Sequence, residues 1–309
     1  MNDSVAFLRS RWTPEARAEA LRFLQGQPVA HPVPVIEQQG KTQFDLRGLQ
    51  VEQAQLDEVL IKNVNLRWAT FRDVGFKGAQ LVKCNLSQTA FADCYFRRAR
   101  IQRCDAVSAR FDGCDFSHAQ IESSRLDFAA FRNCEIRLQD ISFRDDARPE
   151  VLARVCRNLK LNVISMGHYA DAGDLAFMEQ TFERHALWAL AFKATHESTA
   201  QRTRAVARWL GSLLLGWTWG YGEKPARLAL AILFNILAFG TLQYWLDAIP
   251  GKGWWEHAYF SGITFLTIGY GDVAPVGFLP RLVAVLEGVA GIATLGMLIA
   301  SATKKIMYR

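Results

Sequence analysis

The segment of this 309-residue sequence that best suits ion chemistry is Thr267-Ile268-Gly269-Tyr270-Gly271-Asp272. A cation that leaves water needs oxygen atoms in place of its hydration shell, and consecutive backbone carbonyls supply them when they all point to one axis. Such a backbone alternates between conformations, some with positive φ, which glycine adopts without steric cost. Gly269 and Gly271 stand at alternate positions, and Thr267 adds a hydroxyl oxygen. The segment therefore predicts a cation site lined by the backbone carbonyls of Thr267, Ile268, Gly269 and Tyr270.

Three apolar segments would position this site. Trp254 to Leu266 is too short to cross a bilayer, which takes about 20 apolar residues. Leu228 to Leu246 carries no charge and Leu282 to Thr303 carries only Glu287, so both can span. We expect membrane spans at about 226–247 and 281–303, with a pore helix at about 255–267 between them.

The ion-binding segment must be enclosed, because non-helical backbone at membrane depth is tolerated only inside protein or lining a cavity. One strand gives one quarter of a ring of carbonyls, so four chains around an axis are expected. Ile268 and Tyr270 are expected to pack outward against the pore helix and fix the width of the opening. The negative C-terminal end of that helix favours a cation.

The distribution of basic residues predicts the orientation in the membrane. Arg208, Lys224 and Arg227 precede the first span and Lys304, Lys305 and Arg309 follow the second, against only Lys252 and Arg281 between them. By the positive-inside rule both termini are cytoplasmic. The first eleven residues have no long apolar core and no small-residue cleavage site, so no secretory signal is expected. These features predict a multi-pass protein of the cell (inner) membrane.

The hexapeptide resembles the signature of potassium channels. The resemblance extends from Val273 to Ser301, where Pro275-Val276, Arg281-Leu282-Val283-Ala284-Val285 and Val289-Ala290-Gly291-Ile292 look like simple two-span bacterial channels. It implies a homotetramer in the lipid bilayer that passively conducts K⁺ as a permeant ion, without a voltage sensor. It also implies that Gly291 is the gating hinge and that 300–304 lie near a cytoplasmic gate. Ile263 stands where some bacterial relatives carry a glutamate that bonds to the aspartate after the filter, which leaves Asp272 without that partner.

Two residues of the second predicted span keep two interpretations each. Glu287 is a membrane carboxylate, a functional candidate by default, and it can brace the filter from behind. It can also reach the outer interface, since it lies within about two helical turns of Arg281. Gly291 can bend the inner helix or allow helices to pack closely, as small residues often do in membranes.

The region from Phe44 onward repeats every five residues. From Leu46 to Ile141 the central position of each unit is a large apolar residue, from which only Ala106 departs. Two residues earlier, alanine, cysteine, serine or threonine dominates. A five-residue period fits neither a helix nor strict strand alternation. If each unit forms one side of a four-sided coil, both columns point inward and stack on their equivalents 20 residues later, about 4.8 Å away.

This repeat, as in Cys84-Asn85-Leu86 and Cys114-Asp115-Phe116, resembles the pentapeptide-repeat family. The resemblance implies a right-handed quadrilateral β-solenoid of about five coils over residues 41–145. Cysteines spaced at multiples of ten residues also suggest a zinc site. The coil, however, puts them in two opposite inward columns, one with Cys84 and Cys104 and the other with Cys94, Cys114 and Cys134. We therefore interpret them as small buried residues.

The remaining segments are predicted to be helical. Residues 1–40 form a helical cap, with a helix that begins at Thr13-Pro14 and ends before Gly26. Residues 146–222 form a helical linker, with helices in 151–161 and 175–192 separated by Gly167 and Gly173. Its apolar run 209–217 is too short to span and suits an interfacial helix. With the transmembrane pore domain at 223–309, the fold class is mixed: a cytoplasmic β-solenoid, a helical linker and an all-α two-span pore domain.

Composition limits the functional classes. The formal charge of +6 lies mostly outside the repeat, and the nearly balanced charges of 41–145 argue against nucleic-acid mimicry or a nucleic-acid partner. The histidines show no ligand spacing and no nucleophilic constellation occurs, so we expect neither an enzyme nor a cofactor. A potassium-selective channel, a weakly selective cation channel and a non-conducting scaffold that displays the solenoid all remain open. We expect the solenoid to regulate gating or assembly, through an unknown ligand or protein.

Overall fold

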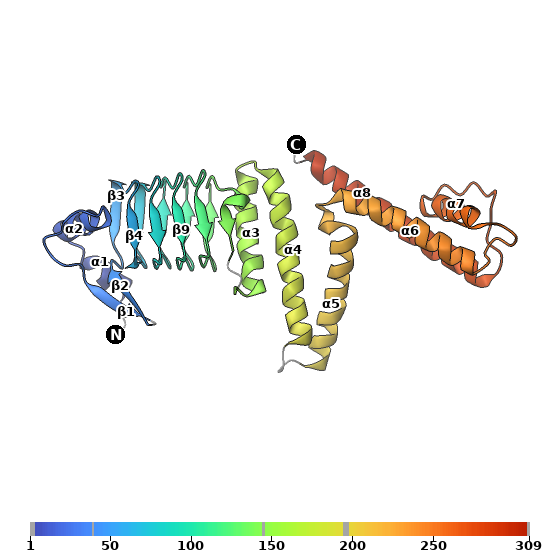
Figure 1. Cartoon of the computed structure of the whole chain (residues 1–309), viewed down its shortest axis with the longest axis horizontal. Helices are drawn as coiled ribbons and strands as arrows, with labels where there is room; N and C mark the ends of the chain where they lie inside the picture. The colour runs from blue at the N-terminus through green and yellow to red at the C-terminus, as the bar shows by residue number, and fades with distance from the viewer. Residues whose placement is uncertain (1–3, 39, 144–145, 194–197, 308–309) are drawn as a thin grey trace. The chain divides into compact units, whose positions relative to one another are not determined.

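The computed structural model describes residues 4–38, 40–143, 146–193 and 198–307, apart from the side chains of Gln38, Pro225 and residues 304–307 (Figure 1). The chain divides into two compact units, residues 1–189 and residues 190–309. Of the basic residues expected after the second span, the side chains of Lys304 and Lys305 and the whole of Arg309 lie outside the described residues.

The first unit is built around a β-solenoid of about five coils, as predicted. Two of its sides are parallel five-stranded sheets. One sheet contains β3 (Gln50–Gln55), β6 (Thr70–Gly75), β8 (Ala90–Ala92), β10 (Arg110–Asp112) and β12 (Ala130–Arg132). The other contains β4 (Leu60–Lys62), β7 (Gln80–Val82), β9 (Arg100–Gln102), β11 (Gln120–Glu122) and β13 (Ile141–Ser142). Every pair in these sheets joins residues 20 apart, such as Phe71 with Phe91, so the five-residue period is confirmed.

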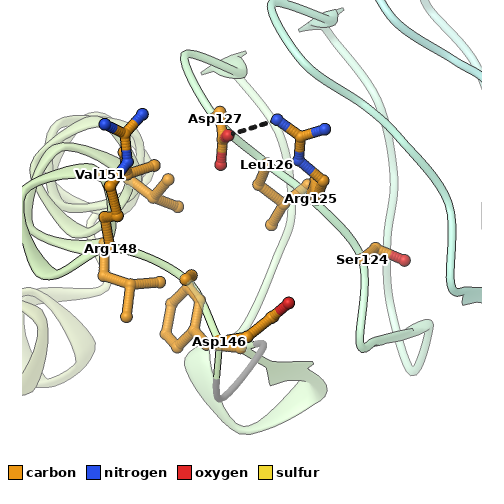
Figure 2. A pocket seen from close by; sticks show the side chains of 11 residues that line it. Ser124, Arg125, Leu126, Asp127, Asp146, Arg148 and Val151 are labelled. Carbon is orange, nitrogen blue, oxygen red and sulfur yellow. Dashed lines mark hydrogen bonds and ion pairs between the residues drawn. The ribbon is translucent and has the colours of Figure 1, made fainter. Parts of the chain in front are cut away.

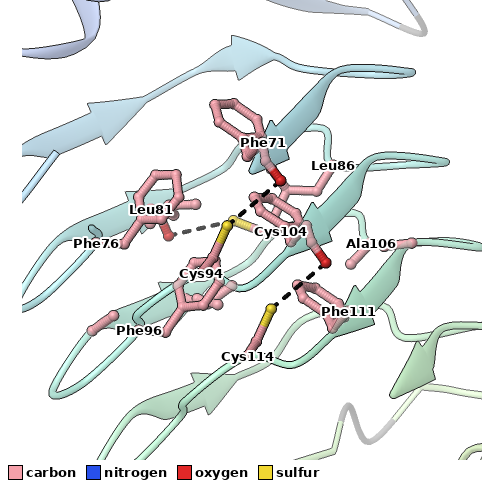
Figure 3. Packing of buried hydrophobic residues seen from close by; sticks show 14 of the residues in the cluster. Phe71, Phe76, Leu81, Leu86, Cys94, Phe96, Cys104, Ala106, Phe111 and Cys114 are labelled. Atoms are coloured by element: carbon pink, nitrogen blue, oxygen red, sulfur yellow. Dashed lines mark hydrogen bonds between the residues drawn. The ribbon is translucent and has the colours of Figure 1, made fainter. Parts of the chain in front are cut away.

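The interior of the solenoid holds the two columns that the sequence predicts. Figure 3 shows phenylalanines stacked coil upon coil with small residues beside them. Phe71 and Phe91 stack with ring centroids 5.1 Å apart, and Phe91 and Phe111 follow at 5.0 Å. Cys94 and Cys114 are fully buried, and their thiols face backbone carbonyls of the preceding coil. Each coil thus buries apolar surface against the next, which is where this unit gains its stability.

The corners of the coil adopt a left-handed backbone conformation that the sequence did not predict. Every fifth residue from Gly48 to Asn133 has a positive φ, and most of these residues are not glycine. Trp68 and Phe128, for example, have φ of 62° and 59°. A left-handed residue with a side chain costs roughly 1–2 kcal/mol, so the stacking of the coils must offset this strain.

The N-terminal cap is larger than the helix that the sequence predicts. The expected helix is present as α2 (Pro14–Leu24), with the Thr13 hydroxyl accepting from the Ala16 N–H. A further helix, α1 (Val5–Ser10), precedes it, and β1 (Val35–Gln38) pairs antiparallel with β2 (Lys41–Asp45). β2 in turn pairs with β5 (Val64–Asn65). The cap and the solenoid therefore share a sheet across the boundary expected at residue 40.

The other end of the solenoid is closed by a helix rather than joined to a free connector. After η1 (Leu138–Asp140), α3 (Pro149–Ser165) buries Val155, Leu159 and Val163 in the solenoid core. Its Asn162 amide accepts from the Cys134 N–H at 2.9 Å and donates to the Cys134 carbonyl at 2.8 Å. One side chain thereby replaces the donor and the acceptor that a further coil would present. The following helix, α4 (Tyr169–Phe192), runs through Gly173, so only Gly167 separates the two, contrary to expectation.

The second unit is helical. It contains α5 (Thr199–Thr218), η2 (Gly220–Gly222), α6 (Pro225–Trp245), α7 (Trp254–Phe265) and α8 (Phe278–Met307). Among the residues that the structure describes, two helical segments are long and apolar enough to cross a membrane. They are Ala226–Trp245 and Phe278–Thr303. Their large side chains are mostly exposed in the single chain, unlike those of a core helix in a soluble protein. The Trp219 indole donates to the Ser301 hydroxyl, which joins the turn after α5 to α8.

Candidate functional site

The segment after α7 has the alternating backbone that carbonyl coordination requires. Thr267, Gly269 and Gly271 have φ of 58°, 60° and 76°, whereas Ile268 and Tyr270 do not have positive φ. The sequence predicts positive φ at the two glycines, whereas Thr267, predicted to end the helix at about 255–267, adopts it as well. The helix ends at Phe265 instead, and the Ile268 N–H donates to the Ile263 carbonyl at 2.8 Å.

Helix α7, the predicted pore helix, is held at its N-terminal end by polar contacts that the sequence did not predict. The His257 ring is fully buried, with Nδ1 2.8 Å from the Gly253 carbonyl and Nε2 3.2 Å from the Ile249 N–H. Its Nδ1 therefore donates and its Nε2 accepts. Against α6, a Cβ on Gly240 would lie 2.8 Å from the Ala258 Cα, so the two helices are in close contact. These contacts fix the helix that precedes the segment 267–272.

Asp272 has a partner, although the expected carboxylate position is occupied by Ile263. The Tyr259 hydroxyl of α7 donates to the Asp272 carboxylate at 3.0 Å. Tyr259 precedes Ile263 by one helical turn, so both lie on one face of α7. The residue that could have predicted this contact from the sequence was therefore Tyr259, one helical turn before Ile263, the position where a carboxylate was expected.

Glu287 lies between α8 and the pore helix. Its carboxylate accepts a hydrogen bond from the Ser261 hydroxyl of α7, which also lies 2.8 Å from the Ile236 carbonyl of α6. Glu287 is completely buried, and its second oxygen finds no partner among the described residues. Of its two interpretations, the geometry favours contact with the pore helix, while its effect on the filter remains a prediction.

Gly291 lies in the middle of α8 at a close contact with the end of α7. A Cβ added to Gly291 would lie 2.0 Å from the Phe265 carbonyl oxygen, a distance that no real contact allows. The helix α8 runs unbroken through this position from Phe278 to Met307. The packing role is thus visible in the structure, while the hinge role remains a prediction.

The whole segment 267–272 is exposed in a single chain. The side chains of Ile268 and Tyr270 are 49% and 70% exposed, so packing against the chain's own pore helix is not what covers them. In a membrane protein a non-helical backbone between two spans needs protein or a cavity around it, because lipid offers its N–H and carbonyl groups no partners. One chain therefore does not complete this site.

The solenoid contains no group of three or more histidine, cysteine, aspartate or glutamate side chains that could hold a metal, as far as the described residues go. The hydrogen bond with Cys114 and burial hold the pKa of the Cys134 thiol well above its usual range, which disfavours the thiolate that zinc binds.

A cavity of about 290 Å³ lies between the last coil and α3 (Figure 2). Its Arg125 is bonded to Asp127 at 3.1 Å, and Arg148 and Asp146 also line it, so its charges balance.

Comparison with known proteins matches both parts of the chain. Residues 231–308 match the model of an ion channel family, and residues 52–88 and 90–127 match pentapeptide repeats, in eight copies. Protein LctB of Geobacillus stearothermophilus is 29% identical over 108 residues, which is 34% of this chain and 73% of that protein. Protein LctB of Bacillus caldotenax is 27% identical over the same shares.

Solved structures that resemble the chain are pentapeptide repeat proteins. One, from the Arabidopsis thaliana thylakoid lumen, is 18% identical, with a TM-score of 0.29 over 35% of this chain and 76% of its own. Another, from the cyanobacterium Cyanothece 51142, is 16% identical, with a TM-score of 0.18 over 32% of this chain and 87% of its own. From the family matches, the chain carries pentapeptide repeats in its N-terminal region and an ion channel domain at its C-terminus, and it is a membrane protein.

Proposed function

We propose that the ion channel domain forms a homotetrameric, potassium-selective pore in the cell (inner) membrane, with both termini cytoplasmic. The observation that carries this proposal is the alternation of positive φ at Thr267, Gly269 and Gly271 in a segment that one chain leaves exposed. Successive carbonyls in such a backbone can face one axis, and four copies would surround a dehydrated K⁺. The ion is the permeant species and not a cofactor, and the channel domain supports no enzymatic role.

The tetramer would also cover what the single chain exposes. Tyr270 and Ile268, which were expected to pack on the chain's own pore helix, would instead pack against neighbouring subunits and still hold the opening at a fixed width. Tyr259 would hold Asp272 at the outer end of the filter. The absence of an arginine-rich helix among the two candidate spans supports a pore without a voltage sensor.

A recording of the purified full chain in a planar bilayer under a potassium gradient tests the proposal. We expect a reversal potential near the K⁺ equilibrium potential that shifts when Na⁺ replaces K⁺. Gly269→Ala places a side chain at φ 60° in the filter and should abolish the selectivity or the current. Gly288→Ala, where an added Cβ meets nothing within 4 Å in the chain, is the matched control. A monomer in lipid, or equal passage of Na⁺ and K⁺, would contradict the proposal.

The weakly selective cation channel is the second candidate. The same recording distinguishes it from the selective pore, because its reversal potential would not change when Na⁺ replaces K⁺. A scaffold without conduction would give no current in any ionic condition. The backbone alternation favours a pore over the scaffold, and the reversal potential separates the selective pore from the weakly selective one.

We further propose that Glu287 braces the filter through Ser261. Its carboxylate is the buried link between α8 and the pore helix that ends at Phe265, two residues before Thr267. Ser261→Ala and Glu287→Leu should each shorten the open time. The double variant should be little worse than either single one, because both remove the same bond, worth about 1.5–3 kcal/mol. Additive effects, or open times unchanged in both variants, would contradict the brace.

A further inference from the structure

A basic hollow lies on one corner of the solenoid, far along the chain from the proposed pore. It has a volume of about 290 Å³, and its charged lining consists of Lys41, Arg67, Lys83, Arg103, Arg125 and Asp105. Five cationic side chains thus face a single carboxylate. We call this cavity the basic hollow.

The repeat itself gathers these cations. Lys83 and Arg103 occupy the same left-handed corner in two successive coils, with φ of 56° and 53°. The Lys83 N–H donates to the Gln102 carbonyl at 3.0 Å, which keeps the two corners adjacent. Strand β2 closes the hollow from the side, because the Gln43 amide donates to the Lys83 carbonyl at 3.1 Å.

The lone carboxylate does not neutralise the hollow. Asp105 is shared by Arg125 at 3.3 Å and Lys41 at 3.9 Å, and Arg125 also bonds Asp127 at 3.1 Å. These two cations therefore have acidic partners. The remaining three do not: Arg67 donates twice to the neutral Gln88 amide, at 3.1 and 2.9 Å. The side chains of Lys83 and Arg103 make no hydrogen bond or ion pair with the part of the chain that the structure describes.

Arg67 is the least exposed of the three cations without an acidic partner. Burial and the neighbouring Arg47, which lies outside the hollow, lower the pKa of the Arg67 guanidinium. An anion beside Arg67 would favour its charged form. Elsewhere on the solenoid, exposed Arg97 is paired with Asp115.

We propose that the basic hollow binds a ligand that carries phosphate groups with at least two negative charges. The fork-shaped guanidinium groups of Arg67 and Arg103 suit phosphate oxygens, and the Lys83 ammonium adds a point charge. A cavity of this volume has room for more than one phosphate group, because a water molecule takes about 30 Å³. A soluble phosphate compound and a phospholipid headgroup share this chemistry.

The test measures binding to the purified full chain in detergent, by titration calorimetry. The soluble probes are pyrophosphate and ATP, and the lipid probe is dihexanoyl phosphatidic acid. The test variant replaces Arg67, Lys83 and Arg103 by glutamine. The control variant replaces Lys77, Arg98 and Arg110 by glutamine, which removes the same charge from exposed positions on other sides of the solenoid.

We expect at least one probe to bind once per chain, and the test variant to bind it about tenfold or more weakly while the control variant binds as the native chain does. Loss for pyrophosphate and ATP alone assigns a soluble ligand, and loss for the lipid alone assigns a headgroup. No binding of any probe, or equal weakening in both variants, overturns the proposal. Because no ion flow is measured, this result is independent of whether the pore conducts K⁺.

Discussion

Gly291 shows how one residue of the inner helix constrains the pore domain. An alanine there would place its Cβ 2.0 Å from the Phe265 carbonyl oxygen, and backbone cannot yield as a side chain can. Phe265 is the last residue of α7, so the contact fixes the distance between α8 and α7, the helix that precedes the proposed filter. The requirement for glycine at this position follows from packing, whether or not the helix also bends there.

Gly291→Ala should lower the thermal stability of the channel, by about 3 kcal/mol or more for such overpacking. Alanine otherwise stabilises a helix interior by about 1 kcal/mol relative to glycine, so the expected sign is the reverse of the usual one. Gly288→Ala and Gly296→Ala are matched controls, because an added Cβ meets nothing within 4 Å in the chain. The midpoint of heat-induced unfolding in detergent measures all three. Equal midpoints for Gly291→Ala and its controls, with altered gating only, would favour the hinge over the packing role.

At the scale of the element, a stack of parallel coils must be terminated at both ends. Its last coil presents backbone groups that the next coil would satisfy, and such edges otherwise invite pairing with other chains. At the C-terminal end α3 covers the edge with apolar side chains and with the Asn162 amide. At the N-terminal end Trp12, in the turn between α1 and α2, donates from its indole to the Arg47 carbonyl at 2.9 Å, and Ala20 and Leu24 of α2 are buried in the same core.

Asn162→Leu should destabilise the last coil by about 2–3 kcal/mol, because the buried N–H and carbonyl of Cys134 both lose their partner. Asn162→Asp should also destabilise the last coil, because it buries a charge and leaves the Cys134 carbonyl facing a carboxylate oxygen that cannot donate. Leu161→Ala, at the exposed neighbouring position, is the control. Amide hydrogen exchange of residues 126–142 in the full chain measures the effect as faster exchange. Protection equal to that of the native chain would show that α3 covers the edge without Asn162.

At the scale of the whole molecule, the chain divides near the C-terminal end of α4 and not after the solenoid. The first unit ends at Ala189, and α3 belongs to it through Val155, Leu159 and Val163. The boundary at residue 145 that the sequence suggested therefore divides a single hydrophobic core. The linker's remaining helix, α5, belongs to the second unit with the candidate spans.

A chain truncated to residues 146–309 should aggregate in detergent, because it exposes the apolar face of α3, whereas 190–309 should remain monodisperse. Size-exclusion chromatography after detergent extraction compares them. Replacing Val155, Leu159 and Val163 by polar residues in 146–309 should prevent the aggregation and give a monodisperse peak. If 146–309 is already monodisperse, α3 does not depend on the solenoid. Unchanged gating and assembly in 190–309 would also remove the regulatory role expected of the repeats.

The sequence by itself determined the elements whose signals are local and periodic. The five-residue period defined the solenoid, its interior columns and its 20-residue register, because stacking repeats one spacing over and over. Two long apolar runs, one without charge and one with Glu287 alone, predicted the candidate spans, and the glycine spacing predicted the segment 267–272. In each case the physical requirement, burial or backbone freedom, acts on residues close together in the chain.

Only the tertiary structure decided which distant residues meet. Three hydrogen-bonded pairs join residues that are 13 to 28 positions apart, and nothing in the sequence of one member predicts the other. They are Tyr259 with Asp272, Ser261 with Glu287, and Asn162 with Cys134. The basic hollow likewise depends on register, since its cations come from separate coils and one hairpin strand. A hydrogen bond or a charge cluster depends on side chains that approach to a few ångströms. Folding sets that distance, and sequence separation does not.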